Sequence, residues 1–294
     1  MVRIGINPLT WTNDDLPALG DENSLEKCLT EARQAGYEGV ELGRKFPRDA
    51  AVLGPILKNF QLKLASGWYS GRLLERSVDD EIRALQPHLT LLKMLGATAM
   101  VFCEVSRCVH GDRKVPLSKR PQLAEKEWKP FSERLDALAA YLEKQGVGMA
   151  YHHHMGTVIQ AEDEVDRVMD STRHVGLLLD TGHLTFAGGD PLRALKRHAK
   201  RITHVHCKDI RKDKLAEAKK QDMSFLDAVL GDAFAVPGDG SIDFEPILKE
   251  LARHQYSGWL VVEADQDPAK AHPLTHARIG HDCLRPLAKR YWTK

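Results

Sequence analysis

The chain contains 294 residues, of which 43% are hydrophobic and 28% charged, a balance typical of a globular protein. Its 42 basic and 41 acidic side chains give a formal net charge of +1, which offers little support for a nucleic-acid partner. No apolar run reaches the roughly 18 residues of a membrane span. The first residues, MVRIGINPLT, lack the apolar core of a signal peptide, so we expect a cytoplasmic protein with no membrane contact.

Short strand-like segments alternate with longer amphipathic segments along the whole chain. The strand candidates, in chain order, are RIGINPL, GVELG, LKLASGW, TAMVFCEV, VGMAYHHH, VGLLLDTG, ITHVHCKD and WLVVEAD. Helix candidates between them include residues 23–36, 79–96 and 127–146, and each of these ends at a glycine just before the next strand. In 79–96 the leucines recur at three- and four-residue steps, which indicates one buried face of a helix.

This alternation predicts an α/β fold, namely a single (β/α)8 TIM-barrel domain over residues 1–294 with its helices outside. A doubly wound open sheet is the alternative, but no G-x-G-x-x-G follows the first strand. Two long polar segments, at about 105–126 and 209–244, follow candidate strands. We expect them to lie over the carboxyl-terminal rim of the barrel, where substrate loops usually sit.

Polar and aromatic residues gather where the candidate strands end. Taken strand by strand, they are Trp11; Glu41; Trp68; Glu104; His152 and His154; Asp180 and His183; His206, Lys208 and Asp209; Glu263 and Asp265. Active sites of barrels are built at this rim, so the concentration over several strands predicts a functional site there.

Three consecutive histidines end the fifth candidate strand. Because side chains alternate along a strand, His152 and His154 share one face and His153 points the other way. We predict a divalent cation held by one of His152 or His154 together with three residues from the following strands, which are Asp180, His206 and Glu263. Two imidazoles and two carboxylates favour Mn²⁺, Co²⁺, Fe²⁺ or Zn²⁺ over Mg²⁺ or Ca²⁺.

Structural roles compete with this interpretation. A single carboxylate at a strand end often caps the next helix, and His204 lies one layer deeper than His206, which favours an interior role for it. Burying Asp180, His206 and Glu263 together in one barrel mouth without a function would be costly. The functional interpretation of these three residues is therefore favoured.

Several segments resemble a known family. GLLLDTGH, HVHCKD, PGDGSIDFEPILKEL and YSGWLVVEAD resemble the sugar isomerase/epimerase-like barrels related to xylose isomerase. Within that superfamily, YHHHMGT, CEVS and VPLSKRP resemble the inosose dehydratases of myo-inositol catabolism. The resemblance covers nearly the whole chain. It implies a hydro-lyase that dehydrates the keto-cyclitol 2-keto-myo-inositol with one divalent metal, Mn²⁺ or Co²⁺, and it makes glutathione a possible further cofactor.

The resemblance also implies residue roles. Asp180, His206 and Glu263 match metal ligands of the superfamily, and His183 matches the histidine that follows the aspartate by three residues. On the fifth strand the superfamily has a glutamate, and His152 takes that position, with His154 as the alternative. A neutral imidazole cannot replace a carboxylate as a base on one face of the substrate, which favours one-sided proton abstraction followed by elimination.

Catalytic and substrate-binding roles are expected for further rim residues. Glu263 or His183 is the candidate base, and Lys208 or Glu104 the candidate for orientation and acid assistance. Expected substrate contacts are Trp11, Glu41, Trp68, His154, His110, Arg120, Asp209 and Asp265.

Other functions remain possible on the sequence alone. A keto-sugar isomerase or epimerase would use the same metal site. A DNA repair endonuclease would need more metal ligands and a basic groove, and a non-catalytic polyol-binding module would be expected to lack Asp180, His183 and Glu263 together. A homo-oligomer is compatible with each of these.

Overall fold

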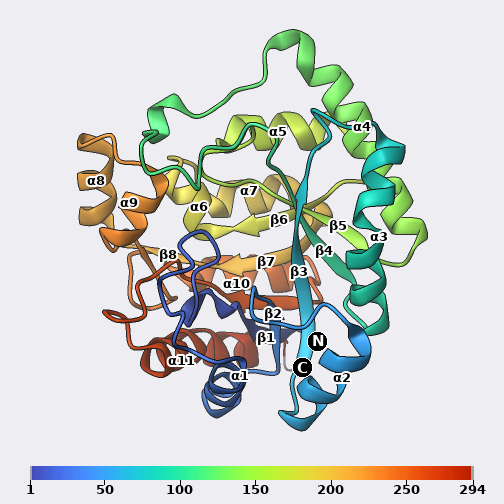
Figure 1. Cartoon of the computed structure of the whole chain (residues 1–294). Coiled ribbons are helices and arrows are strands. Elements are labelled where there is room, and N and C mark those ends of the chain that lie inside the picture. Colours follow the sequence, from blue (N-terminus) through green and yellow to red (C-terminus); the bar gives the residue numbers. More distant parts are fainter. Residues whose placement is uncertain (1, 293–294) are drawn as a thin grey trace.

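A computed structural model describes residues 2–292 and shows a closed barrel of eight parallel strands surrounded by helices (Figure 1). The first strand pairs with both the second and the last, which confirms the predicted barrel and excludes an open sheet. The barrel strands are β1 (Arg3–Ile6), β2 (Gly39–Leu42), β3 (Lys63–Gly71), β4 (Ala99–Glu104), β5 (Gly148–His152), β6 (Gly176–Asp180), β7 (Ile202–Cys207) and β10 (Trp259–Val262).

Helices cover the outside of the barrel. They are α1 (Leu25–Gln34), α2 (Ala50–Asn59), α3 (Val78–Met94), α4 (Glu125–Lys144), α5 (Glu162–Ser171), α6 (Thr181–Phe186), α7 (Pro191–His198), α8 (Lys212–Lys220), α9 (Phe225–Leu230), α10 (Phe244–Arg253) and α11 (Pro273–Trp292). Short 3₁₀ turns are η1 (Pro8–Thr10), η2 (Leu117–Lys119) and η3 (Ala199–Arg201). Within residues 2–292, no helix is both long enough and apolar enough to cross a membrane.

Helix α3 illustrates how local sequence sets these elements. Ser77 caps its first turn by accepting a hydrogen bond from the backbone N–H of Asp80. Leu85, Leu89 and Leu92 recur on one face and are buried. Just beyond the helix, Gly96 adopts φ +75°, a left-handed conformation that suits glycine at a helix end.

The alternation of side chains along the strands separates two regions of core. On β4, Met100 and Phe102 point outward into the large core between barrel and helices. Ala99 and Val101 point into the barrel, where they pack with Ala150. Polar residues replace apolar ones inside the barrel at the carboxyl-terminal end of the strands, and these polar residues form the site.

The two long segments follow β4 and β7. Residues 209–244 contain a small antiparallel pair, β8 (Asp209–Ile210) and β9 (Phe234–Ala235), together with α8 and α9, which lie beside α6 (Figure 1). The two segments contact each other, because the backbone N–H of Leu117 donates to the carbonyl of Met223 and Ser118 Oγ donates to Asp222. They therefore form one joined cover on one side of the rim.

Candidate metal centre and active site

The candidate metal ligands come from four adjacent strands. His152 is the last residue of β5 and Asp180 the last residue of β6. His206 pairs with Asp180 across β6 and β7, and Glu263 directly follows β10. All four side chains are buried. The strand ends thus bring together the four residues that the sequence assigned to one site.

Two atoms in this cluster have unmet bonding capacity. His206 Nδ1 lies 2.8 Å from Glu263 Oε2 and 3.5 Å from Asp180 Oδ2. His152 Nε2 lies 3.8 Å from the same Asp180 oxygen. Despite these distances, Asp180 Oδ2 and His206 Nδ1 are buried with no hydrogen bond of acceptable geometry. Since buried polar atoms normally have a partner, this pair fits a bound cation.

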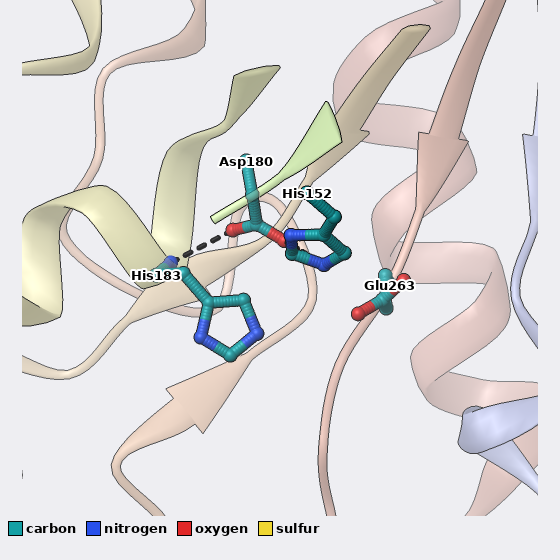
Figure 2. A group of neighbouring side chains, drawn as sticks. All are labelled: His152, Asp180, His183 and Glu263. Carbon is teal, nitrogen blue, oxygen red and sulfur yellow. Dashed lines mark hydrogen bonds and ion pairs between the residues drawn. The ribbon is translucent and has the colours of Figure 1, made fainter. Parts of the chain in front are cut away.

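His183 adds a further donor from the first turn of α6. Ligand atoms of His152, Asp180, His183 and Glu263 all lie within 4.8 Å of one another, and Figure 2 shows these side chains. Asp180 Oδ1 accepts a hydrogen bond from the backbone N–H of His183 at 2.7 Å, which caps α6 and fixes the two residues relative to each other. This group of imidazoles and carboxylates could hold a metal ion. It contains His183 and not the predicted His206, which instead lies in a second close group with Glu41 and His204.

Glu41 on β2 holds His206 from the side away from Asp180. Its carboxylate lies 3.1 Å from His206 Nε2 and 2.8 Å from His204 Nε2. It also accepts hydrogen bonds from Asn7 Nδ2 and Ser66 Oγ. A carboxylate on the far nitrogen of a ligating histidine fixes the orientation of the ring. His204 lies in the deeper layer, as its position in the strand indicates.

Lys208 is a buried cation behind the cluster. Its Nζ lies 2.6 Å from Asp265 Oδ2, 2.7 Å from Glu263 Oε1 and 2.9 Å from His183 Nε2. Burial by itself would lower the pKa of Lys208, but Asp265 and Glu263 outweigh it and raise the pKa above its usual value. Lys208 is therefore a firmly protonated ammonium group that fixes both carboxylates.

The histidines differ in protonation. Burial lowers the pKa of His152 and His183 well below the usual value and that of His154 to about 3, so these rings are neutral. For His206, burial also acts to lower the pKa, but Glu263 and Glu41 raise it well above the usual value. A metal ligand must be neutral, so a bound cation would displace the proton of His206.

A cavity of about 280 Å³ opens above the cluster. His152, His154 and His206 line it together with Glu263 and Asp265, whereas His153 does not. This placement matches the alternation predicted for the three consecutive histidines.

Part of the cavity lining is apolar. The apolar residues are Leu9, Leu42, Trp68 and Val101. The Trp68 ring meets His152 edge-on, with centroids 5.4 Å apart, and its Nε1 donates to Ser70 Oγ at 2.8 Å. A lining that combines apolar and polar groups suits a ring with a hydrophobic face and polar substituents.

Trp11 and Glu104 lie outside the cavity lining. Trp11 is buried, and its Nε1 donates to Glu31 at 2.6 Å. The carboxylate of Glu104 accepts hydrogen bonds from the backbone N–H groups of Leu73 and Ser106, at 2.6 and 2.9 Å. Trp11 is thus bonded to helix α1 and Glu104 to the segments after β3 and β4, and neither side chain lines the cavity.

Arg120 and Asp209 also lie outside it. Arg120 pairs with Glu164 at 2.8 Å. Asp209 accepts hydrogen bonds from four backbone N–H groups that fold the loop after β9, those of Ile210, Gly238, Ser241 and Ile242. Of the long-loop residues expected to contact substrate, His110 does line the cavity.

The sequence analysis missed Asn7, Asp14, Asp15 and Ser70, which line the cavity. Asn7 had a usable signal, because it directly follows the first strand, whereas Trp11 lies a full turn beyond it. Asn7 Nδ2 donates to Glu41 at 2.7 Å and to Glu263 at 3.0 Å, so it links the two carboxylates. Asp14 and Asp15 follow η1, and no local pattern indicates that this loop turns inward.

Comparison with known proteins agrees with this architecture. The rhizopine catabolism protein MocC of Rhizobium meliloti is 54% identical over 288 residues, which cover 98% of this chain and 89% of that protein. An inosose dehydratase of Clostridium perfringens is 44% identical over 279 residues, or 94% of each chain. Among solved structures, the IolI protein with a zinc atom has the same fold, with a TM-score of 0.71 at 17% identity over 99% of this chain and 100% of that chain.

A family model supports the same grouping. The model for the xylose isomerase-like TIM barrel matches residues 29–287, which include all the candidate ligands. The match covers most of the chain, and the relatives are similar over nearly their full length. The chain belongs to the xylose isomerase-like TIM barrel family.

Proposed function

We propose that this chain is a metal-dependent dehydratase that removes water from 2-keto-myo-inositol to give a deoxy-diketo cyclitol. The observation that carries the proposal is the 44% identity to an inosose dehydratase over 94% of both chains. The site adds chemical support, since a buried His/Asp/Glu cluster lies beside a cavity lined by both apolar and polar residues.

We propose His152, Asp180, His206 and Glu263 as the metal ligands. The neutral state of His152 and the unpartnered Asp180 Oδ2 and His206 Nδ1 support this set. The mixed nitrogen and oxygen donors suit Mn²⁺, Co²⁺, Fe²⁺ or Zn²⁺, and of these we propose Mn²⁺ or Co²⁺. When bound, such a cation would act as a Lewis acid toward the ketone oxygen of the substrate.

The protein residues supply proton transfer. Of the two candidate bases, Glu263 lines the cavity and His183 does not, so we assign removal of the α-proton to Glu263. Burial acts to raise the pKa of Glu263, but His206 and Lys208 lower it, so the carboxylate is ionised before the reaction. The end of β5 carries the neutral imidazole of His152 and no carboxylate that could act as a second base. Glu263 therefore acts as the base on one side of the substrate.

The departing hydroxyl needs a proton donor. Asp265 lines the cavity, and Lys208 Nζ is bonded to it at 2.6 Å. We assign acid assistance to Lys208 acting through Asp265. Glu104, the other candidate, is engaged by backbone N–H groups away from the cavity. Trp68 and His154 would contact the ring, because both line the cavity.

We further propose that the protein works in the cytoplasm on a small molecule, forms a homo-oligomer, and binds neither nucleic acid nor a membrane. The near-neutral charge of +1 supports the absence of a nucleic-acid partner.

Incubating the Mn²⁺-loaded protein with 2-keto-myo-inositol tests the proposed reaction. We expect loss of one water per turnover and a product that absorbs in the ultraviolet. Exchange of the α-hydrogen with solvent deuterium without loss of water would instead identify an epimerase or isomerase.

A second candidate follows from the relative with 54% identity, whose name assigns it to rhizopine catabolism. Both candidates would use the same site. If a protein with full metal content neither dehydrates 2-keto-myo-inositol nor exchanges its α-hydrogen, a role in rhizopine catabolism becomes the better assignment.

A further inference from the structure

We propose that Asp15 and His110 form a filter at the cavity mouth that holds hydroxyl groups of a neutral ring and disfavours rings carrying a carboxylate or phosphate. This inference deepens the proposed function and rests on it, because it concerns the substrate class of the same cavity.

The two residues meet across the mouth from different loops. His110 Nε2 lies 3.5 Å from Asp15 Oδ1, and both side chains line the cavity. Their side chains are 14% and 33% exposed, which places them between the buried cluster and solvent. Asn13 Oδ1 accepts a hydrogen bond from the Asp15 backbone N–H at 2.9 Å and thereby fixes the turn that presents Asp15.

The loop that carries His110 is also fixed. The backbone N–H of Val109 donates to the carbonyl of Gly156 at 2.8 Å, which ties this loop to the segment after β5. The centroid of the His110 ring lies 5.1 Å from that of His154, and that of His154 lies 5.3 Å from that of His152. His110 therefore stands one ring further from the candidate metal than His154, beside the part of a substrate remote from the reacting carbon.

The bonding capacity of the pair suits hydroxyl groups. His110 Nδ1 is buried and has no hydrogen-bond partner, so the ring retains a nitrogen that is not satisfied within the chain. The Asp15 carboxylate offers several acceptor sites to hydroxyl donors. Burial acts to raise the pKa of Asp15, but the neighbouring His110 lowers it below its usual value, so Asp15 is anionic.

The charges around the cavity disfavour an anionic ring. Among the described residues that line it there are five carboxylates and no lysine or arginine. The ammonium group of Lys208 is completely buried and engaged by Asp265 and Glu263. Burial acts to lower the pKa of His110, but Asp15 raises it to about 10, so this imidazolium is already paired with Asp15. A carboxylate on the ring would therefore meet the carboxylates of the lining without an unpaired cationic side chain, and like charges in a partly enclosed site repel.

Binding of two cyclitols to the Mn²⁺-loaded protein tests the filter. The probes are myo-inositol, which is neutral, and quinate, which carries a carboxylate on a polyhydroxylated ring. Calorimetry gives the affinity of each, and the ratio of the two affinities is compared between the wild-type protein and the Asp15→Asn variant. Any direct bonding of quinate to the metal cancels in this comparison, because Asp15 is not a ligand.

We expect the wild-type protein to bind myo-inositol. In the Asp15→Asn variant, the ratio of the quinate affinity to the myo-inositol affinity should be about tenfold higher than in the wild type. The matched control is Asp21→Asn, which removes a 67%-exposed carboxylate paired with Arg44 outside the cavity lining. This control should leave the ratio unchanged.

Absence of myo-inositol binding to the wild type, or an unchanged ratio in a folded Asp15→Asn variant with full metal content, would overturn the filter. The outcome is separable from that of the proposed function. Dehydration of 2-keto-myo-inositol with an unchanged ratio removes only the filter, whereas a shifted ratio without dehydration removes only the proposed reaction.

Discussion

The surroundings of Glu41 suit a residue that holds His206 in position. Four buried or partly buried donors surround its carboxylate, and His206 is one of them. A substrate hydroxyl would have to compete with these partners for the same oxygens. Glu41 also lines the cavity, where the sequence predicted a substrate contact. We expect its main effect to be on metal affinity, because it fixes His206.

Replacing Glu41 with Gln should weaken Mn²⁺ binding by about 10- to 100-fold, the usual effect of losing a carboxylate behind a ligating histidine. Isothermal titration calorimetry measures this loss directly. Glu75→Gln is the matched control, since Glu75 pairs with Arg72 at the surface and should leave affinity unchanged. Equal Mn²⁺ affinity in the Glu41→Gln and Glu75→Gln variants would refute the positioning role.

Lys208 should contribute to stability as well as to chemistry. Its removal leaves Asp265 and Glu263 buried without their cation, and breaking a buried ion pair in this way costs about 3–5 kcal/mol. Urea unfolding of the metal-free Lys208→Met variant measures the change. Lys129→Met is the control, because Lys129 is 86% exposed and should cost little. Similar free energies of unfolding for both variants would contradict this account.

Among the secondary-structure elements, the end of β5 gives the clearest test of the proposed site. His152 and His154 line one cavity, but only His152 approaches Asp180, with Nε2 at 3.8 Å from Oδ2. His154 instead lies against His183 and His110, with centroids 4.2 and 5.1 Å away. Strand geometry thus gives the proposed ligand His152 and the proposed substrate contact His154 different surroundings.

We expect His152→Ala to abolish stoichiometric metal binding, and His154→Ala to retain the metal while losing most dehydratase activity. Elemental analysis of the purified variants, together with a turnover assay, distinguishes the two effects. Metal loss in the His154→Ala variant with retention in His152→Ala would shift the ligand by two residues and overturn the assignment.

The strand ends could be predicted from the sequence because their signals are local. Alternation of side chains placed His152 and His154 on one face, and the strand ends brought His152, His206 and Glu263 to one rim. The partners of Arg120 and Asp209 could not be predicted, because Glu164 and the backbone around 238–242 are distant in sequence. Asp15 could not be predicted for the same reason, because the direction in which its loop turns depends on contacts with residues distant in sequence.

At the scale of the whole molecule, the barrel closes between β1 and β10. Helix α11 then returns to the start of the chain, where the Tyr37 hydroxyl donates to the carbonyl of Ala277 at 2.7 Å. Because early and late segments complete each other's packing, we propose that residues 1–294 unfold as one cooperative domain.

Calorimetry should therefore show one unfolding transition, and Mn²⁺ at 100 times its dissociation constant should stabilise the protein by about 2.7 kcal/mol. Removing the metal with a chelator should lower the midpoint without splitting the transition. Two separated transitions in the metal-free protein would contradict a single domain.

The metal centre is the central claim, and anomalous diffraction from crystals of the Mn²⁺-loaded protein tests it most directly. We predict one strong peak at the manganese edge among His152 Nε2, Asp180 Oδ2, His206 Nδ1 and the Glu263 carboxylate. The same map shows whether His183 Nε2 or Nδ1 also reaches the ion. No peak at the carboxyl ends of β5, β6, β7 and β10, or a peak elsewhere on the protein only, would contradict the account.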